Sequence, residues 1–590
     1  MSSQSRLLHN RRFLPLFLTQ FLGAFNDNTF KSALVVLLTF QASSWTSMAP
    51  GVLANLAAGV FILPFFLFSA TAGQLADKYD KARLARLVKV LEIGIMLVAG
   101  LGFVLASLGW LFFALFLLGL HSTLFGPIKY ALLPQHLRAD ELLGGNALVE
   151  AGTFVAILLG TIAGGLLAGM GRPATIAEVG GVIAVAGYLA SRAIPPAPPP
   201  APGLKIHPNP LSETWRNIGF ARENRAVFLS ILGISWFWLF GALFLAQFPA
   251  YAKTVLGGSE SAVTLLLATF TIGVGLGSLA CERLSGRQVE LGLVPFGSIG
   301  LTAFALDLAL ASPHAMPAAA PLGLSALLGQ AGTWHILVDL ALIGLFGGFF
   351  IVPLYALMQM RSHVDHRARI IAANNIMNAL FMVVGSLLAA ALLDVGLSIA
   401  ALFGVAALVN AVVAIYIYRL VPEFLVRFVV WLVLHTVGRV DAQGVQEIPS
   451  DGPALLVLDT DGDARPLDVF MIMAACKRPI RFIVEQRLAQ SALSGFVLRA
   501  AKAIFFRPGE APDAVQAGRA ALLAGQLLAV AHNPVAPGAL PGALKVPTFR
   551  LTLRRTATGT QRHLWARSEL RVTAMSTDQT ASPRENAGQC

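Results

Sequence analysis

Ionisable and amide side chains interrupt an apolar stretch near the start of the chain. Asp27 and Lys31 lie there with Asn26 and Asn28, inside the run from Phe13 to Phe40. A charge at the centre of a bilayer costs about 3 kcal/mol on insertion scales, so such charges usually face water or a polar ligand. We interpret this segment as a membrane helix that lines a transport route. A mutually neutralising pair of Asp27 and Lys31, four residues apart, is the structural alternative.

The bulk composition is that of a polytopic membrane protein. The chain has 590 residues, a mean hydropathy of +0.71 and only 13% charged residues, against about 25% in soluble domains. The net charge of +12 is expected in loops that face anionic lipid, not on a nucleic-acid surface. The three cysteines are widely spaced and show no metal-ligand or disulfide pattern. We therefore expect no metal, no cofactor and no nucleic-acid partner.

Twelve stretches are apolar and long enough to cross a bilayer, which takes about 20 residues in a helix. They lie near 13–40, 52–75, 88–108, 110–133, 143–170, 175–192, 226–252, 260–281, 290–311, 333–358, 370–393 and 397–418. The segment 314–332 is also apolar, but its two prolines indicate a surface segment between spans. Lysine and arginine gather in alternate loops, and this pattern predicts that both termini are cytoplasmic.

A proline-rich loop divides the predicted all-α bundle into halves of six spans. The halves are 1–192 and 226–420, and residues 193–225 form a cytoplasmic linker with an amphipathic segment. The halves resemble each other: Pro127 with Tyr130 in the first matches Pro353 with Tyr355 in the second. Two similar halves around a central site are typical of carriers that work by alternating access.

Two motifs carry a resemblance to known transporters. The loop from Gly73 through Asp77 to Arg83 resembles the gating loop of the major facilitator superfamily, although Asp80 replaces a usual glycine. The stretches Phe17–Asn28 and Phe125–Leu137 resemble those of the bacterial lysophospholipid transporters, and this resemblance covers about residues 10–420. It implies a carrier of lysophosphatidylethanolamine and related lipids in the bacterial inner membrane, with membrane lipid around it.

The resemblance suggests roles for individual side chains. Asp27 would hold an ammonium group or a coupling cation, and Lys31 or Lys129 would hold the phosphate. Asp339 is a second candidate carboxylate. The remaining candidates along the path are Asn26, Asn28, Tyr130, Asn146 and Glu150. Gly73, Asp77 and Arg83 would form the gating loop.

The end of the chain resembles a different kind of domain. We expect an interfacial helix at 421–437, a small truncated α/β domain at 438–550 and a disordered tail at 551–590. The α/β domain resembles glycerolipid acyltransferases, whose His-x4-Asp motif supplies a general base and its orienting carboxylate. Asp468 matches the Asp, but Asp463 replaces the His, and Asn533 lies where the phosphate-binding block is expected. We therefore predict no acyl transfer, and a separate acyltransferase is a candidate partner.

Two alternatives stay open at this point. The chain could combine transport with re-acylation, which the missing histidine argues against. It could also be a major facilitator exporter of another small solute, which would share the fold but leaves the Phe17–Asn28 and Phe125–Leu137 stretches unexplained.

Overall fold

The computed structural model describes residues 3–40, 48, 50–285, 292–313, 322–420, 422–437, 440–449, 452–459, 465–476, 478–507, 511–530, 546–556 and 567–574. The chain forms two compact units. The first comprises Met1–Val289 and Leu293–Ala414, and the second contains Ile415–Cys590.

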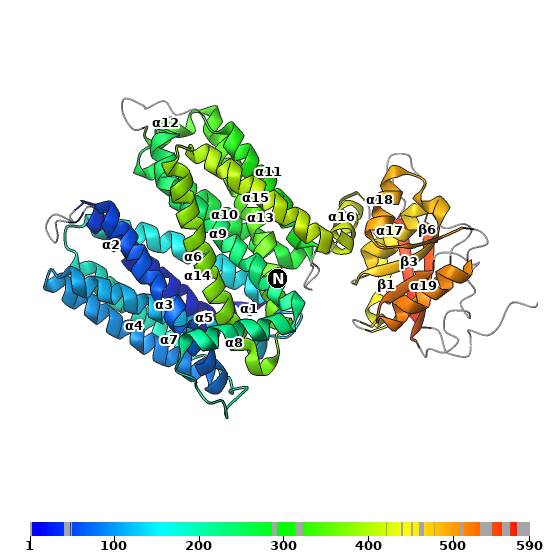
Figure 1. Cartoon of the computed structure of the whole chain (residues 1–590), viewed down its shortest axis with the longest axis horizontal. Helices are drawn as coiled ribbons and strands as arrows, with labels where there is room; N and C mark the ends of the chain where they lie inside the picture. Colours follow the sequence, from blue (N-terminus) through cyan, green and yellow to red (C-terminus); the bar gives the residue numbers. More distant parts are fainter. Residues whose placement is uncertain are drawn as a thin grey trace, which may run out of the picture. The chain divides into compact units, whose positions relative to one another are not determined.

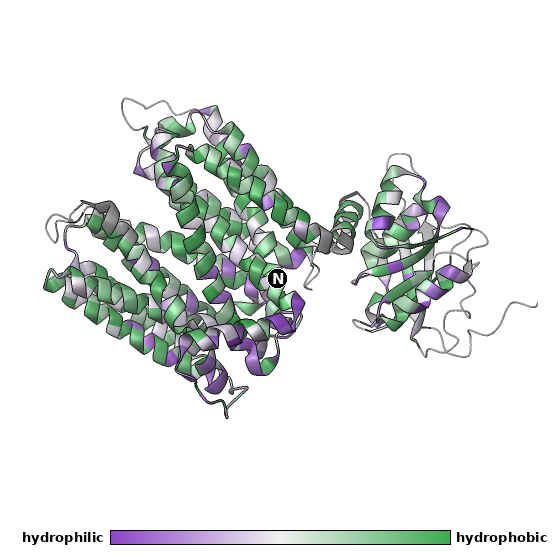
Figure 2. Ribbon diagram, viewed as in Figure 1, coloured by the Kyte–Doolittle hydropathy of each residue, from purple (hydrophilic) through white to green (hydrophobic). Residues whose placement is uncertain are grey.

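The first unit is built almost entirely from long apolar helices (Figures 1 and 2). The first half holds α2 (Leu14–Phe40), α3 (Pro50–Lys78), α4 (Lys81–Val104), α5 (Leu108–His136), α6 (Leu142–Gly169) and α7 (Ala174–Arg192). The second half holds α9 (Arg225–Thr254), α10 (Glu260–Leu284), α11 (Leu293–Ala311), α13 (Ala331–Arg361), α14 (Arg367–Asp394) and α15 (Ile399–Leu420). The short helices α1 (Ser3–Leu7), α8 (Pro210–Glu223) and α12 (Leu324–Leu328) complete the unit.

The expected helical bundle is confirmed. Among the described residues, 11 helices are long and apolar enough to cross a membrane. Helix α2 is not one of them because its polar centre lowers its hydropathy. Its 27 residues nevertheless extend about 40 Å at 1.5 Å per residue, which exceeds the hydrocarbon thickness of a bilayer. Together with α2, these helices account for the predicted spans.

Glycines allow neighbouring helices to approach closely. In α10 and α13, a methyl group added at Gly277 would overlap the carbonyl oxygen of Leu345, and one added at Gly348 would overlap the backbone of Ser278. Inside a membrane, helices associate through close backbone packing and not through hydrophobic burial, so small residues gather at such crossings. The close packing of α10 against α13 therefore requires a glycine on each helix, Gly277 and Gly348.

The proline-rich loop between the halves is extended and attached to the first half. The backbone N–H of Ala197 donates to Asp80 Oδ2 (2.9 Å), and that of His207 donates to Gln74 Oε1 (2.8 Å). Helix α8 follows and lies against both α3 and α14. The connection between the halves thus runs along the ends of the helices that carry the basic loops.

The second unit begins with the end of α15 and with α16 (Pro422–Val437) and contains a seven-stranded sheet. The strand order is β1-β7-β6-β2-β5-β3-β4, with parallel pairs except for β6 and β7. The strands are β1 (Val440–Gln443), β2 (Ala454–Asp459), β3 (Ile480–Glu485), β4 (Ile504–Phe506), β5 (Leu527–Val530), β6 (Thr548–Thr556) and β7 (Arg567–Ala574). The helices between them are α17 (Pro466–Ala475), α18 (Ala492–Ala500) and α19 (Ala511–Leu523).

Both faces of this sheet are covered. Successive residues of β2 alternate, so that Leu456 joins a cluster with Ile472 of α17 while Leu455 joins another with Leu522 of α19. A parallel sheet buried on both faces has nearly continuous apolar strands, as in β2 and β5.

The prediction of a disordered tail from residue 551 is corrected in part. Strand β6 extends to Thr556, and β7 lies wholly within the expected tail. Leu570 and Val572 of β7 are buried in the sheet core. The sequence did not indicate this strand, because Leu570 and Val572 stand among polar residues.

Candidate functional site

A cavity of about 240 Å³ lies within the first unit and is lined by both halves. Its polar lining comprises Gln20, Asp27, His121, Ser122, Lys129, Tyr130, Thr153, Tyr355, Asn375 and Asn378. Its apolar and aromatic lining includes Phe65, Phe125, Trp238 and Met382.

Asp27 of α2 is the carboxylate of this cavity. Ser122 of α5 donates a hydrogen bond from its hydroxyl to Asp27 Oδ2, and Nδ1 of His121 lies 3.7 Å from Asp27 Oδ1. Asp27 Oδ1 itself has no hydrogen-bond partner within the described structure. This oxygen is buried and lies beside the imidazole of His121.

A buried charge network lies behind Asp27. His121 Nε2 is 3.3 Å from Glu92 Oε2, which also accepts from Lys89 Nζ at 2.7 Å. Asn26 Nδ2 donates to the other Glu92 oxygen at 2.8 Å. These side chains come from α2, α4 and α5 and are almost fully buried. The network positions the imidazole against Asp27 and joins three helices of the first half.

Aromatic side chains join the two halves at the cavity. The rings of Tyr130 (α5) and Tyr355 (α13) stack with centroids 4.5 Å apart and planes at 8°. The Tyr130 hydroxyl donates to Glu150 Oε1 at 2.5 Å, and Trp238 Nε1 donates to the Tyr355 hydroxyl at 3.1 Å. Lys129 Nζ lies 4.4 Å from the centroid of the Tyr130 ring, a cation–π distance.

The structure brings three of the predicted transport residues into the cavity lining, namely Asp27, Lys129 and Tyr130. Glu150 contacts the lining through Tyr130. Lys31 lies instead with Nζ 5.2 Å from the Phe61 ring centroid, and no ion pair joins it to Asp27 in the described residues. Asn28 donates back to the Ala24 carbonyl of its own helix. Of the two lysines proposed for a phosphate, only Lys129 therefore faces the cavity.

Asn146 lies outside the lining, at a contact between the halves. Its amide and that of Gln359 (α13) exchange two hydrogen bonds of 2.8 and 2.9 Å, and both residues are fully buried. The pair lies where α6 begins and α13 ends, on the side of the basic loops. These two hydrogen bonds hold the halves together at that end of the bundle.

Asp77 of the predicted gating loop also connects the halves. Its carboxylate accepts from Arg369 Nε at 3.1 Å and from the backbone N–H of Ala368, both on α14. Gly73 permits the approach, since a methyl group there would lie 2.8 Å from the Ala372 Cβ. The Arg83 backbone N–H donates to Asp80, and its side chain forms no ion pair in the described part. The side-chain partner of Asp77 is therefore Arg369 and not Arg83.

The sequence interpretation missed Lys89, Glu92, His121 and Arg369. The first three are ionisable residues inside predicted spans, so the signal that identified Asp27 also applied to them. Arg369 looked like one more basic loop residue, and its pairing with Asp77, far away in sequence, depends on the packing of α14 against α3.

Asp468 in the second unit caps a helix. Its Oδ2 accepts from the Arg465 backbone N–H at 2.9 Å, at the start of α17, and the residue is buried. Asp463 and Asn533, the other two altered catalytic positions, lie outside the described residues. Asp339 is buried in α13 next to His335 and Asp307, away from the cavity lining.

The bundle and its cavity between two similar halves define a multi-pass membrane carrier. A family model of the Major Facilitator Superfamily matches residues 16–323, and the chain belongs to this family. Two solved members show a similar fold: the transporter FucP in the outward conformation (TM-score 0.53, 12% identity, 70% of this chain and 99% of that chain) and the human organic anion transporter MFSD10 (TM-score 0.56, 14% identity, 69% and 99%).

The sequence is also similar to that of curated bacterial transporters. The Lysophospholipid transporter LplT of Serratia proteamaculans is 29% identical over 360 residues, which is 60% of this chain and 81% of the relative. The protein of the same name from Klebsiella pneumoniae is 29% identical over 382 residues, covering 62% of this chain and 85% of the relative.

Proposed function

We propose that this chain moves lysophospholipids across the bacterial inner membrane by alternating access. The observation that carries the proposal is the cavity that presents the Asp27 carboxylate and the Lys129 ammonium group beside an aromatic wall. A zwitterionic head group needs one group of each charge, and a single acyl tail needs apolar surroundings. The similarity to the LplT transporters supports this substrate class.

The cross-half contacts support a state closed on the side of the basic loops. The Asp77–Arg369 ion pair and the Asn146–Gln359 amide pair both lie there. Basic loops face the cytoplasm in most membrane proteins, so we place both termini in the cytoplasm and access to the cavity on the opposite side. Breaking these contacts would then release the substrate inward.

We further propose that the second unit is acyltransferase-like but carries out no acyl transfer. The residue at the histidine position, Asp463, cannot act as an imidazole base. Asp468 is used to cap α17 instead. Full-length protein given an acyl donor and lysophospholipid is therefore expected to form no diacyl product, and product that disappears in Asp468→Ala would show the domain to be active.

The transport proposal is tested by uptake of labelled lysophosphatidylethanolamine into spheroplasts. Asp27→Asn and Lys129→Gln are each expected to reduce uptake at least about tenfold, because each removes a charge-assisted contact worth about 1.5–3 kcal/mol. Lys31→Gln is the matched control, since it removes a lysine outside the lining.

Competition between head groups separates the alternatives. Unlabelled lysophospholipids should compete, and the free head group without an acyl chain should compete weakly. Normal uptake by Asp27→Asn at wild-type expression would refute the site. Absence of any lysophospholipid uptake by the wild type would favour the export of another solute.

A further inference from the structure

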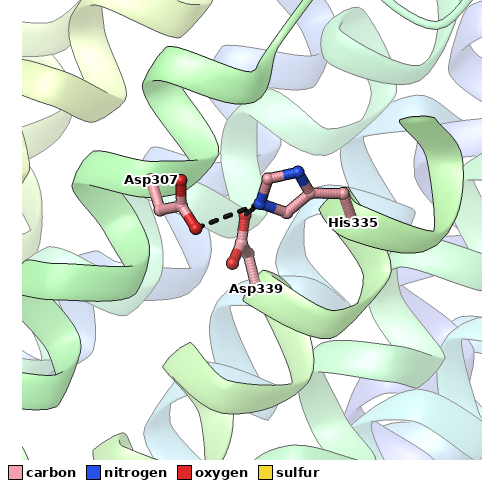
Figure 3. A group of neighbouring side chains, drawn as sticks. All are labelled: Asp307, His335 and Asp339. Carbon is pink, nitrogen blue, oxygen red and sulfur yellow. Dashed lines mark hydrogen bonds and ion pairs between the residues drawn. The ribbon is translucent and has the colours of Figure 1, made fainter.

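Three potential ligand side chains converge away from the cavity, near the ends of α11 and α13 (Figure 3). Asp307 lies in the last turns of α11, and His335 and Asp339 lie in the first turns of α13. His335 Nε2 is 3.0 Å from Asp307 Oδ2 and 3.6 Å from Asp339 Oδ2. One nitrogen and two carboxylate oxygens thus point at a common position between the two helices.

Asp339 is the member that needs an explanation. Its side chain is only 2% exposed, whereas those of His335 and Asp307 are about half exposed. Its Oδ2 faces the cluster but accepts no hydrogen bond within the described structure. A buried carboxylate oxygen without a donor is costly unless a cation compensates it. The imidazole of His335 is within ion-pair distance of this oxygen when protonated (3.6 Å), but its hydrogen bond goes to Asp307 at 3.0 Å.

We propose that these three residues bind a divalent transition-metal ion of the zinc or manganese class. Imidazole nitrogen and carboxylate oxygen are the donors that such ions accept, at about 2.0–2.2 Å. Two ligands at that distance from a tetrahedral ion lie about 3.4 Å apart. The distances from His335 Nε2 to the two carboxylate oxygens, 3.0 and 3.6 Å, lie on either side of this value. Small side-chain movements would therefore bring these atoms into place around an ion.

The site has the features of an accessible ion site. All three ligand atoms lie within 4.8 Å of one another, and the exposed sides of Asp307 and His335 leave a path for the ion. Three protein ligands leave at least one coordination position for water. Because the ligands come from two helices, the bound ion would hold the ends of α11 and α13 together.

Metal binding can be measured on the full-length protein in detergent, after treatment with a chelator. Saturating Zn²⁺ is expected to raise the Tm by about 3 °C, because it binds the folded state alone. His335→Gln and Asp339→Asn should each abolish the rise. Asp394→Asn, which removes an exposed carboxylate at the end of α14, should retain it.

Co²⁺ provides a second measurement, since its visible absorption reports direct coordination. An absorption band is expected in the wild type and should be lost in His335→Gln, which changes a half-exposed side chain and not the buried core. No Tm rise with either ion, or a rise and band that survive His335→Gln, would overturn the proposal. Equal stabilisation by Mg²⁺ that persists in this variant would show general attraction to acidic residues, which also overturns it.

Discussion

Tyr130 of α5 and Tyr355 of α13, the fourth long helix of each half, stack face to face with ring centroids 4.5 Å apart. The contact lies in the lining of the cavity, so it joins the two halves at the candidate site.

The Tyr130 hydroxyl should stabilise the buried Glu150. Tyr130→Phe keeps the stacked ring but removes the 2.5 Å hydrogen bond. We expect it to lower the free energy of unfolding by about 1–3 kcal/mol, because a buried carboxyl group loses its donor. Denaturation in detergent measures the change. Tyr416→Phe, at an exposed position of α15, is the control, and equal effects of the two substitutions would contradict the interpretation.

Glu92 should be required for the stability of the first half. Glu92→Gln leaves the Lys89 ammonium group, 2.7 Å away and fully buried, without its carboxylate. Breaking such a pair costs about 3–5 kcal/mol, and we expect a loss of this size in the same assay. Replacing both members, by Lys89→Met with Glu92→Leu, should recover part of it. A double variant less stable than Glu92→Gln would show that the pair itself is not the cause.

The α10–α13 contact should not tolerate a side chain at Gly277. Gly277→Ala places a methyl group against the Leu345 carbonyl, so the two helices must separate. Gly275→Ala adds the same methyl group two residues earlier, where no neighbouring helix lies within 4 Å of it. We expect a clear fall in Tm for the first and little change for the second. Similar melting temperatures would contradict the close packing described.

Closure on the side of the basic loops should depend on Asp77. Asp77→Asn weakens charge-assisted hydrogen bonds to α14, and a loss of about 1.4 kcal/mol shifts the population of open molecules tenfold. The rate at which a thiol reagent labels a cysteine introduced by Ala372→Cys should rise about tenfold. Asp365→Asn removes an exposed carboxylate nearby and should leave the rate unchanged. An unchanged rate in Asp77→Asn would rule out this gate.

Cys476 in the second unit should react slowly with alkylating reagents. Burial raises the pKa of its thiol to about 12, so at pH 8 only about one molecule in 10⁴ carries the reactive thiolate. We expect labelling in a Cys281→Ser, Cys590→Ser background to accelerate by about 10³ on unfolding. A folded-state pKa above the unfolded value stabilises the fold at lower pH, and this contribution declines from about pH 9 to 12. Rapid labelling of the folded protein at pH 8 would contradict the burial.

The sequence was sufficient to predict the helical bundle, and it singled out Asp27, which the structure places in the cavity lining. These features depend on local properties: an apolar run of sufficient length must form a helix in lipid, and a charge inside it stands out. Lys89, Glu92 and His121 are also ionisable residues inside apolar spans, so the same local signal marks them. The strand β7 was missed because its buried residues, Leu570 and Val572, stand among polar residues, so its local apolar pattern is weak.

The tertiary structure decided which polar residues meet. It placed Lys129 in the cavity and Lys31 against Phe61, paired Asp77 with Arg369, and brought Asp307 next to His335 and Asp339. Each pairing joins residues of different helices, and their meeting depends on the rotation and crossing of those helices. Hydropathy identifies a span but leaves its rotation undetermined, because that rotation is set by packing against neighbouring helices.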